Sequence, residues 1–279
     1  MKKALTCIAI AASFIAAPIS PTFASPADDL AAFQSFFKKR FAETPFEDYN
    51  NGVYSIDKAS REQWESIEEF PPYEINVDNG EEAYGKAFAN GKTYASCFGD
   101  DVSKIRAKYP HWDKDTGAVR TLEEDINACR ATNGEKELKY KKGKIADLTA
   151  YIGYQARGQK INIEIPDDPK ALAAYESGKH FFYAKRGQLN LSCADCHIYY
   201  SGSKIRADLL SPALGHLSHF PVYRSKWGGL GTPHRRYAGC NKQVRAKWFK
   251  AQGDEYKNLE LFHTYMSNGL EYNGPGARK

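Results

Sequence analysis

The sequence predicts a mainly α-helical protein built from two related halves, and three observations support this prediction. Apolar residues recur at helical spacing in several segments, as at Phe33, Phe36 and Phe37, and give each segment one apolar face. A short cysteine-containing motif occurs once in each half. The chain of 279 residues is long enough for two modest cores, and its 13% aromatic content can fill them.

Start signals support several of the expected helices. Asp28 and Asp29 lie in the first turn of the first helix, and residues 167–169 (DDP) form a capping start for the helix that leads to the second motif. The expected helical ranges are 26–43, 60–70, 121–130, 144–158, 167–186 and 254–266.

An extended crossover at residues 159–166 separates the two helical halves. We therefore place a domain boundary after residue 160. Residues 25–160 form the first predicted domain, and residues 161–279 form the second.

The second half contains residues 193–197 (CADCH), the C-x-x-C-H signature of covalent c-type haem attachment. In this motif Cys193 and Cys196 form thioether bonds to the porphyrin, and His197 ligates the iron. A zinc site would need a second Cys/His pair, whereas the other cysteines are isolated, and a redox dithiol would not need the histidine. The motif therefore predicts one covalently bound c-type haem in a cytochrome c-like domain.

A shift of 99 residues aligns this motif with a segment of the first half. Residues 94–98 (YASCF) fall on 193–197, and residues 84–86 (YGK) fall on 183–185 (YAK). The first copy has tyrosine in place of one thioether cysteine and phenylalanine in place of the iron ligand. We therefore predict two cytochrome c-like domains in tandem, the first having lost its haem.

The first 24 residues indicate a cleavable signal peptide. Two lysines precede an apolar run at 4–17, and residues 22–24 (TFA) resemble a small-x-small cleavage site. Pro18 and Pro21 break the run before the roughly 20 residues that a membrane span requires. We therefore predict export to the periplasm without a membrane span, and loss of the two lysines lowers the net charge from +5 to about +3.

Processing also removes Cys7 and leaves three cysteines outside the haem motif: Cys97, Cys129 and Cys240. A disulfide between Cys97 and Cys129, which are 32 residues apart, would stabilise the fold by about 3 to 4 kcal/mol. We predict this disulfide as the local crosslink in place of the lost haem. The alternative is that both are buried free thiols.

The second half offers three kinds of distal ligand for the iron. Met266 is the only methionine that remains after processing, and Cys240 is the remaining cysteine. We expect Cys240 in a glycine-containing turn just before a basic helix, where helix-start amides would favour a thiolate. The histidine candidates of this half are His180, His216, His219, His234 and His263.

No acidic residue lies between Asp208 and Asp254. Such a segment favours a thiolate and an anion together, so we expect it to meet a small oxyanion or an acidic protein. A nucleic acid fits an exported haem protein poorly, and a solvated face without function is the alternative. The basic residues of this segment are Arg224, Lys226, Arg235, Arg236, Lys242, Arg245, Lys247 and Lys250.

The haem motif, residues 234–241 (HRRYAGCN) and the ending 273–279 (NGPGARK) together resemble the SoxA family, the larger subunits of the SoxAX cytochromes of thiosulfate-oxidising bacteria. The resemblance extends over essentially the whole mature chain. Many members carry two haems, but Tyr94 and Phe98 make this sequence similar to the single-haem branch. By that resemblance Cys97 and Cys129 would be vestiges of the first haem's attachment and axial ligation.

The resemblance also implies a role for each site residue. Cys193 and Cys196 would hold the haem, and His197 would be its proximal ligand. Cys240 would be both the distal ligand and the catalytic sulfur, often modified as a cysteine persulfide. Arg236 would bind the sulfonate end of thiosulfate, as guanidinium groups do for oxyanions.

The implied activity is that of an L-cysteine S-thiosulfotransferase. Thiosulfate would be joined oxidatively to a cysteine thiol of the SoxYZ carrier, and two electrons would leave through the haem. The SoxX cytochrome subunit would complete a heterodimer. Two other functions remain open at this point: an electron-transfer cytochrome with Met266 or a histidine as distal ligand, and a haem-based sensor.

Overall fold

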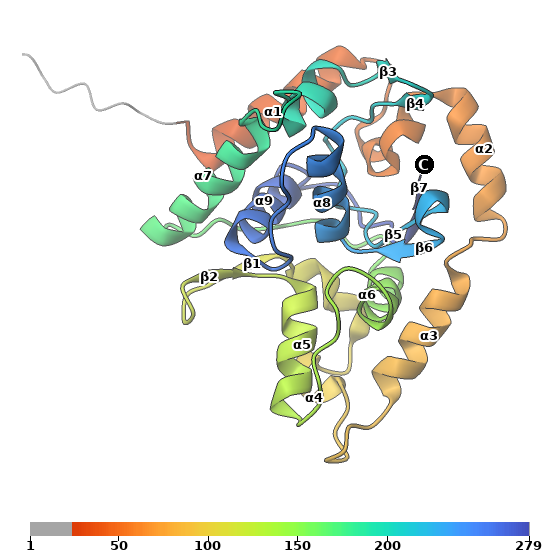
Figure 1. Cartoon of the computed structure of the whole chain (residues 1–279), viewed down its shortest axis with the longest axis vertical. Coiled ribbons are helices and arrows are strands. Elements are labelled where there is room, and N and C mark those ends of the chain that lie inside the picture. The colour runs from red at the N-terminus through yellow and green to blue at the C-terminus, as the bar shows by residue number, and fades with distance from the viewer. Residues whose placement is uncertain (1–23, 279) are drawn as a thin grey trace, which may run out of the picture.

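The computed structural model describes residues 24–278 and is mainly helical, with three small sheets among the helices (Figure 1). The predicted signal peptide lies outside the described residues except for Ala24. No helix in the described part of the chain is long and apolar enough to cross a membrane.

The helices confirm the expected pattern and add three that the sequence ranges had omitted. The α-helices are α1 (Pro26–Arg40), α2 (Lys58–Glu68), α3 (Glu74–Gly85), α4 (Ala95–Phe98), α5 (Leu122–Thr132), α6 (Lys144–Gln155), α7 (Pro169–Tyr183), α8 (Pro233–Gln243) and α9 (Asp254–Tyr265). Asp168 caps α7 through hydrogen bonds from the amides of Lys170 and Ala171, as the sequence predicted.

Two helix pairs cross in the same way, α3 over α6 and α7 over α9. A Cβ atom at Gly80 would lie 2.1 Å from the backbone oxygen of Asp147, and one at Gly178 would lie 2.0 Å from that of Asn258. Only glycine allows helices to approach so closely at these positions. This shared geometry supports the predicted tandem repeat.

The positions of these glycines also correct the alignment of α3 with α7. Gly80 and Gly178 are 98 residues apart, so Tyr84 is equivalent to Phe182 and not to Tyr183. Burial agrees, because Tyr84 is 7% exposed and Phe182 0%, whereas Tyr183 is 39% exposed.

The helices that carry the isolated cysteines, α5 and α8, form a third equivalent pair. Each is preceded by a threonine N-cap, Thr121 or Thr232, and each carries a cysteine eight residues further on, Cys129 or Cys240. The offset is 111 residues, the same as between Asp147 and Asn258. The repeat therefore continues through the cysteine helices and the helices that follow them.

The predicted disulfide between Cys97 and Cys129 is present and joins α4 to α5. Cys129 is buried in a core cluster that includes Tyr94 and against which Phe98 packs, whereas Cys97 lies at the surface. The alternative of two free thiols is therefore wrong.

The N-terminal helix packs against the second half of the chain. Phe33 meets the ring of Phe182, and the Asp29 carboxylate accepts hydrogen bonds from Tyr175 and Lys179 of α7. Residues far apart in sequence thus form the main core cluster.

A three-stranded sheet leads directly into α8. It consists of β5 (Val222–Arg224), β6 (Gly229–Gly231) and β7 (Gly276–Arg278), with β6 antiparallel and β7 parallel to β5. Arg224 is paired with Gly229 on one side and Arg278 on the other. Two short hairpins complete the strands: β1 (His111–Asp113) with β2 (Ala118–Arg120), and β3 (Lys204–Ile205) with β4 (Asp208–Leu209).

Candidate active site

The C-x-x-C-H segment is held by a reciprocal cap at its start. The Ser192 amide donates to Asp195 Oδ2 at 2.8 Å, and the Asp195 amide donates to Ser192 Oγ at 3.0 Å. A single π-helical turn follows over Asp195–Tyr199, and such turns are frequent at functional sites. This local structure fixes the backbone from which Cys193, Cys196 and His197 project.

His197 has the environment of an iron ligand. Its Nδ1 lies 2.9 Å from the Ser211 carbonyl, which fixes the proton on Nδ1 and leaves the lone pair on Nε2. Burial lowers the pKa of His197 to about 4, so the imidazole is neutral near pH 7. A neutral imidazole is the form that binds a metal.

Two further histidines surround this ligand. The Ser211 hydroxyl lies 2.7 Å from His216 Nε2, and the ring centroids of His197 and His216 are 4.4 Å apart. The ring centroid of His263 lies 5.1 Å from that of His216. Burial lowers the pKa of both His216 and His263, so no positive charge competes with a metal on His197. Sequence reasoning included His216 among the candidate iron ligands but missed Ser211, which lies in an irregular loop.

Cys240 lies inside α8 and not in a turn before a helix, so the expected position was wrong. The helix begins at Pro233, and Cys240 falls near its C-terminal end. Amides of a helix start therefore do not surround its sulfur. Thr232 and Pro233 form an ordinary N-cap and N1 start, and Gly239 is tolerated within the helix.

The fold brings Cys240 to the C-x-x-C-H motif. The pKa of Cys193 is raised to about 12, first by burial and then by the charge of Cys240. The pKa of Cys196 is raised by the same two causes in the same order. All three cysteines are free thiols, so Cys193 and Cys196 are not joined as a redox disulfide.

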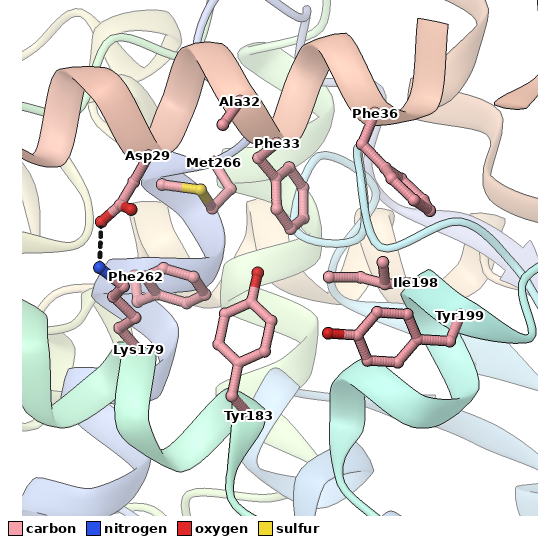
Figure 2. Close-up of a pocket in the computed structure, with 10 residues that line it drawn as sticks. All are labelled: Asp29, Ala32, Phe33, Phe36, Lys179, Tyr183, Ile198, Tyr199, Phe262 and Met266. Atoms are coloured by element: carbon pink, nitrogen blue, oxygen red, sulfur yellow. Dashed lines mark hydrogen bonds and ion pairs between the residues drawn. The ribbon is translucent and has the colours of Figure 1, made fainter. Parts of the chain in front are cut away.

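Met266 occupies a different place from Cys240. It is 1% exposed and lines a cavity of about 210 Å³ between α1, α7 and α9. Figure 2 shows its thioether beneath α1, with Phe33 and Phe262 nearby and the Asp29–Lys179 ion pair beside them. Met266 thus serves as a packing residue of the main core cluster.

Two arginines are near Cys240. Arg236 precedes it by one helical turn on α8, and Arg224 projects from β5. The pKa of Arg224 is lowered to about 10 by burial and by the charge of Arg236, while the charge of Cys240 acts in the opposite direction. Neither arginine forms an ion pair within residues 24–278. Sequence analysis had included Arg224 only as one member of a basic run.

Trp227 fixes this basic surface. The guanidinium carbons of Arg224 and Arg235 lie 5.5 and 4.2 Å from its ring centroid. Arg235 also donates to the Leu230 carbonyl at 2.8 Å. Arg235 is therefore committed to structure, whereas Arg236 has no such partner.

The donor set fits a covalently attached haem. Two thiols at C-x-x-C spacing, a neutral imidazole with Nε2 available and a third sulfur close by are the groups that such a haem needs. The buried Nη1 of Arg186, a residue on which the charge of Cys193 acts, has no hydrogen-bond partner. A carboxylate such as those of haem would satisfy it. Residues 24–278 contain no group of three or more His, Cys, Asp or Glu suited to hold a lone metal ion.

The fold and this site define a c-type cytochrome in which a cysteine and an arginine lie beside the haem-attachment motif. A family model described as SoxA/TsdA, cytochrome c domain, matches residues 79–161, which lie almost wholly in the predicted first domain. That half is thus itself a cytochrome c domain by sequence.

Comparison with known proteins identifies the family. The chain is 58% identical over 264 residues to the L-cysteine S-thiosulfotransferase subunit SoxA of Allochromatium vinosum, covering 94% of both chains. It is 53% identical over 251 residues to the same subunit of Chlorobaculum tepidum, covering 90% of this chain and 87% of the relative. The chain belongs to the SoxA family.

A solved structure agrees. The crystal structure of SoxXA from P. pantotrophus matches with a TM-score of 0.68 and 34% identity, covering 75% of this chain and 79% of the other. The shared fold extends over most of both chains.

Proposed function

We propose that this protein is the SoxA subunit of an L-cysteine S-thiosulfotransferase, which conjugates thiosulfate oxidatively to a cysteine thiol of a SoxYZ carrier. The relatives that are 58% and 53% identical carry the name of this activity. The observation that supports it best is the position of Cys240: it lies beside the two motif cysteines and one turn after Arg236.

In this proposal Cys193 and Cys196 would hold one covalent haem, His197 would be its proximal ligand and Cys240 its distal ligand. Such a haem would supply a redox centre for the electrons of the reaction. Tyr94 and Phe98 lack the groups needed for a second attachment, and Cys97 is used in the disulfide. One haem per chain is therefore the expected content.

Arg236 binds the sulfonate end of thiosulfate, because a guanidinium without a carboxylate partner can donate two parallel hydrogen bonds to an oxyanion. Its position one turn before Cys240 directs the outer sulfur of thiosulfate towards the Cys240 sulfur. Cys240, which we propose to be modified as a cysteine persulfide, provides the reacting sulfur. That sulfur would bond to the outer sulfur of thiosulfate with loss of two electrons, and the carrier thiol would then displace it, give up its proton and take the S-thiosulfonate group. Arg224 adds a second positive charge near the same sulfur.

The overall reaction is balanced by two electrons and one proton. A carrier thiol and thiosulfate give the carrier S-thiosulfonate, a proton and two electrons. The S–H bond of the carrier breaks and a new S–S bond forms. The two electrons would go to the redox centre that the haem supplies when bound, and the positive surface around Arg236 would stabilise the dianionic substrate.

The biological setting follows from the family. The matching crystal structure contains SoxX as the partner of its SoxA chain, and we propose the same heterodimer here. We also propose a periplasmic location after cleavage at residue 24. We propose domains 25–160 and 161–279, with α1 of the first packed against α7 of the second.

The test is conversion of the carrier by the complete heterodimer. With thiosulfate and an electron acceptor, the mass of the carrier should rise by one S-thiosulfonate group on its cysteine. Electron transfer without any change in carrier mass would show a simple electron-transfer cytochrome and would overturn the proposal.

A further inference from the structure

A basic groove lies beside α8, between two loops from different halves of the chain. One loop follows α5 and the other follows α8, so the two are equivalent in the repeat. The groove has a volume of about 570 Å³. We call it the lysine groove, and its lining residues are Lys139, Tyr140, Lys141, Lys142, Trp248, Phe249, Lys250 and Ala251.

The wall from the first half is fixed at both ends. The buried Asn127 side chain exchanges two hydrogen bonds with Leu138, at 2.9 and 2.8 Å. Thr232, the N-cap of α8, donates its hydroxyl to the Tyr140 carbonyl at 2.9 Å and its amide to the Lys141 carbonyl at 3.3 Å. This wall is therefore attached to the helix that carries Cys240.

The wall from the second half is fixed as well. The amide of Phe249 donates to the Tyr256 hydroxyl at 3.2 Å, and the amide of Gln252 donates to His234 Nδ1 at 3.0 Å. Trp248 remains 47% exposed, with the Lys242 ammonium 4.3 Å from its ring centroid. A groove with two anchored walls loses little conformational entropy when a partner binds.

The charge of the groove is of one sign. Its lining contains four lysines and no acid, and none of these lysines forms an ion pair with another residue of the described range 24–278. Lys242 adds a fifth positive charge at the rim, two residues after Cys240. An exposed tryptophan and a partly buried tyrosine among cations suit an acidic polypeptide, which offers both carboxylates and apolar groups.

We propose that the lysine groove docks an acidic segment of the protein that carries the acceptor thiol. This inference rests on the proposed function, which requires a carrier to deliver its cysteine to Cys240. A carrier bound in the groove is aligned along α8, because Thr232 links the groove wall to the start of that helix. In this proposal the carrier docks first, and its cysteine thiol then enters the site beside Cys240.

The experiment compares two charge-reversal triples in the complete haem-containing heterodimer. The first is Lys139→Glu, Lys141→Glu and Lys142→Glu, whose backbone contacts with Thr232 are retained. The control carries three reversals at exposed lysines of other elements: Lys58→Glu, Lys114→Glu and Lys170→Glu. Both triples change the net charge equally.

We expect the groove triple to weaken carrier binding by about tenfold or more at low ionic strength, and to flatten the dependence of binding on salt. The Michaelis constant for thiosulfate, the haem spectrum and the SoxX content should stay unchanged, and the control should bind the carrier within about twofold of wild type.

Equal binding by the groove triple and the control would overturn the docking proposal. Loss of SoxX from the groove triple would also overturn it, since the groove would then be the subunit interface. Failure of the proposed function is distinguishable, because the wild-type heterodimer would then not convert the carrier at all.

Discussion

The two cysteine helices, α5 and α8, are equivalent in the repeat, but the state of the cysteine that each carries differs. Cys129 of α5 is bonded to Cys97, whereas Cys240 of α8 remains a free thiol beside Cys193 and Cys196. One turn before the cysteine, α5 has Asp125 and α8 has Arg236. The same helix geometry thus supports a crosslink in one half and leaves a free thiol one turn after an arginine in the other.

The surroundings of these equivalent positions differ in charge. Asp125 accepts hydrogen bonds from Arg120 and from the Tyr109 hydroxyl, at 2.7 Å for the latter, and so is fully engaged in the core. Arg236 forms no ion pair among residues 24–278 and lies within a segment that has no acidic residue. The two helices therefore differ in the charge that they leave unpaired beside the cysteine.

The largest expected effect is that of removing the free sulfur. Cys240→Met should lower carrier conjugation by at least about 10³-fold, because the reacting sulfur is lost. Haem should stay attached, since Cys193 and Cys196 are unchanged. Turnover and intact mass measure the two outcomes, and an unaffected turnover rate would remove Cys240 from the mechanism.

Removal of the crosslink should affect stability and not chemistry. Cys97→Ser with Cys129→Ser should lower the free energy of unfolding by about 3 to 4 kcal/mol, because the bond closes a loop of 32 residues. The melting temperature should fall by roughly 10 °C. Conjugation at moderate temperature should persist; its loss would show that the first half takes part in catalysis.

Arg236→Lys tests the geometry of anion binding with the charge retained. A lysine cannot donate the paired hydrogen bonds of a guanidinium, so kcat/KM for thiosulfate should fall by about 10- to 100-fold. Arg235→Lys is the matched control, because Arg235 stacks on Trp227. Equal losses in the two variants would contradict the specific role of Arg236.

The smallest expected effect is a change in how stability depends on pH. It concerns Glu123 of α5, which is equivalent in the repeat to His234 of α8. Burial and the charge of Glu260 raise the pKa of Glu123 from its ordinary value of 4.5 to about 7, against the opposing charges of Arg106 and His234. Between about pH 4.5 and pH 7 the folded protein therefore keeps a proton on Glu123 that the unfolded chain has lost. The stability of the fold falls as the pH rises through this window.

Glu123→Gln should remove this dependence. Relative to wild type, the variant should gain stability on the order of 1 kcal/mol between about pH 5 and pH 8. Denaturant unfolding at several pH values measures the difference. A constant difference across the window would show that Glu123 does not titrate there.

Local signals explain what could be predicted from sequence. The C-x-x-C-H motif, the Asp168 cap of α7 and the apolar periodicity of α1 and α9 each depend on neighbouring residues, and all are found where expected. The disulfide was also predictable, because a chain predicted to be exported had few cysteines left to pair.

The remaining features depend on contacts between distant segments. Cys97 precedes Thr121 by 24 residues, whereas Cys196 precedes Thr232 by 36 residues. A single shift of the sequence therefore could not align both the short cysteine motifs and the cysteine helices α5 and α8. Ser211 reaches His197 from a loop without a regular pattern. The lysine groove joins two loops more than a hundred residues apart, and Gly239 had suggested a turn where α8 continues.

The electron paramagnetic resonance spectrum of the oxidised heterodimer tests the central proposal most directly, that Cys240 and His197 would both ligate the haem iron. We expect a low-spin signal of thiolate ligation in the wild-type protein that disappears in Cys240→Met, while the signal of the SoxX haem is unchanged. A wild-type spectrum without the thiolate signal, or one that Cys240→Met does not alter, would contradict the account.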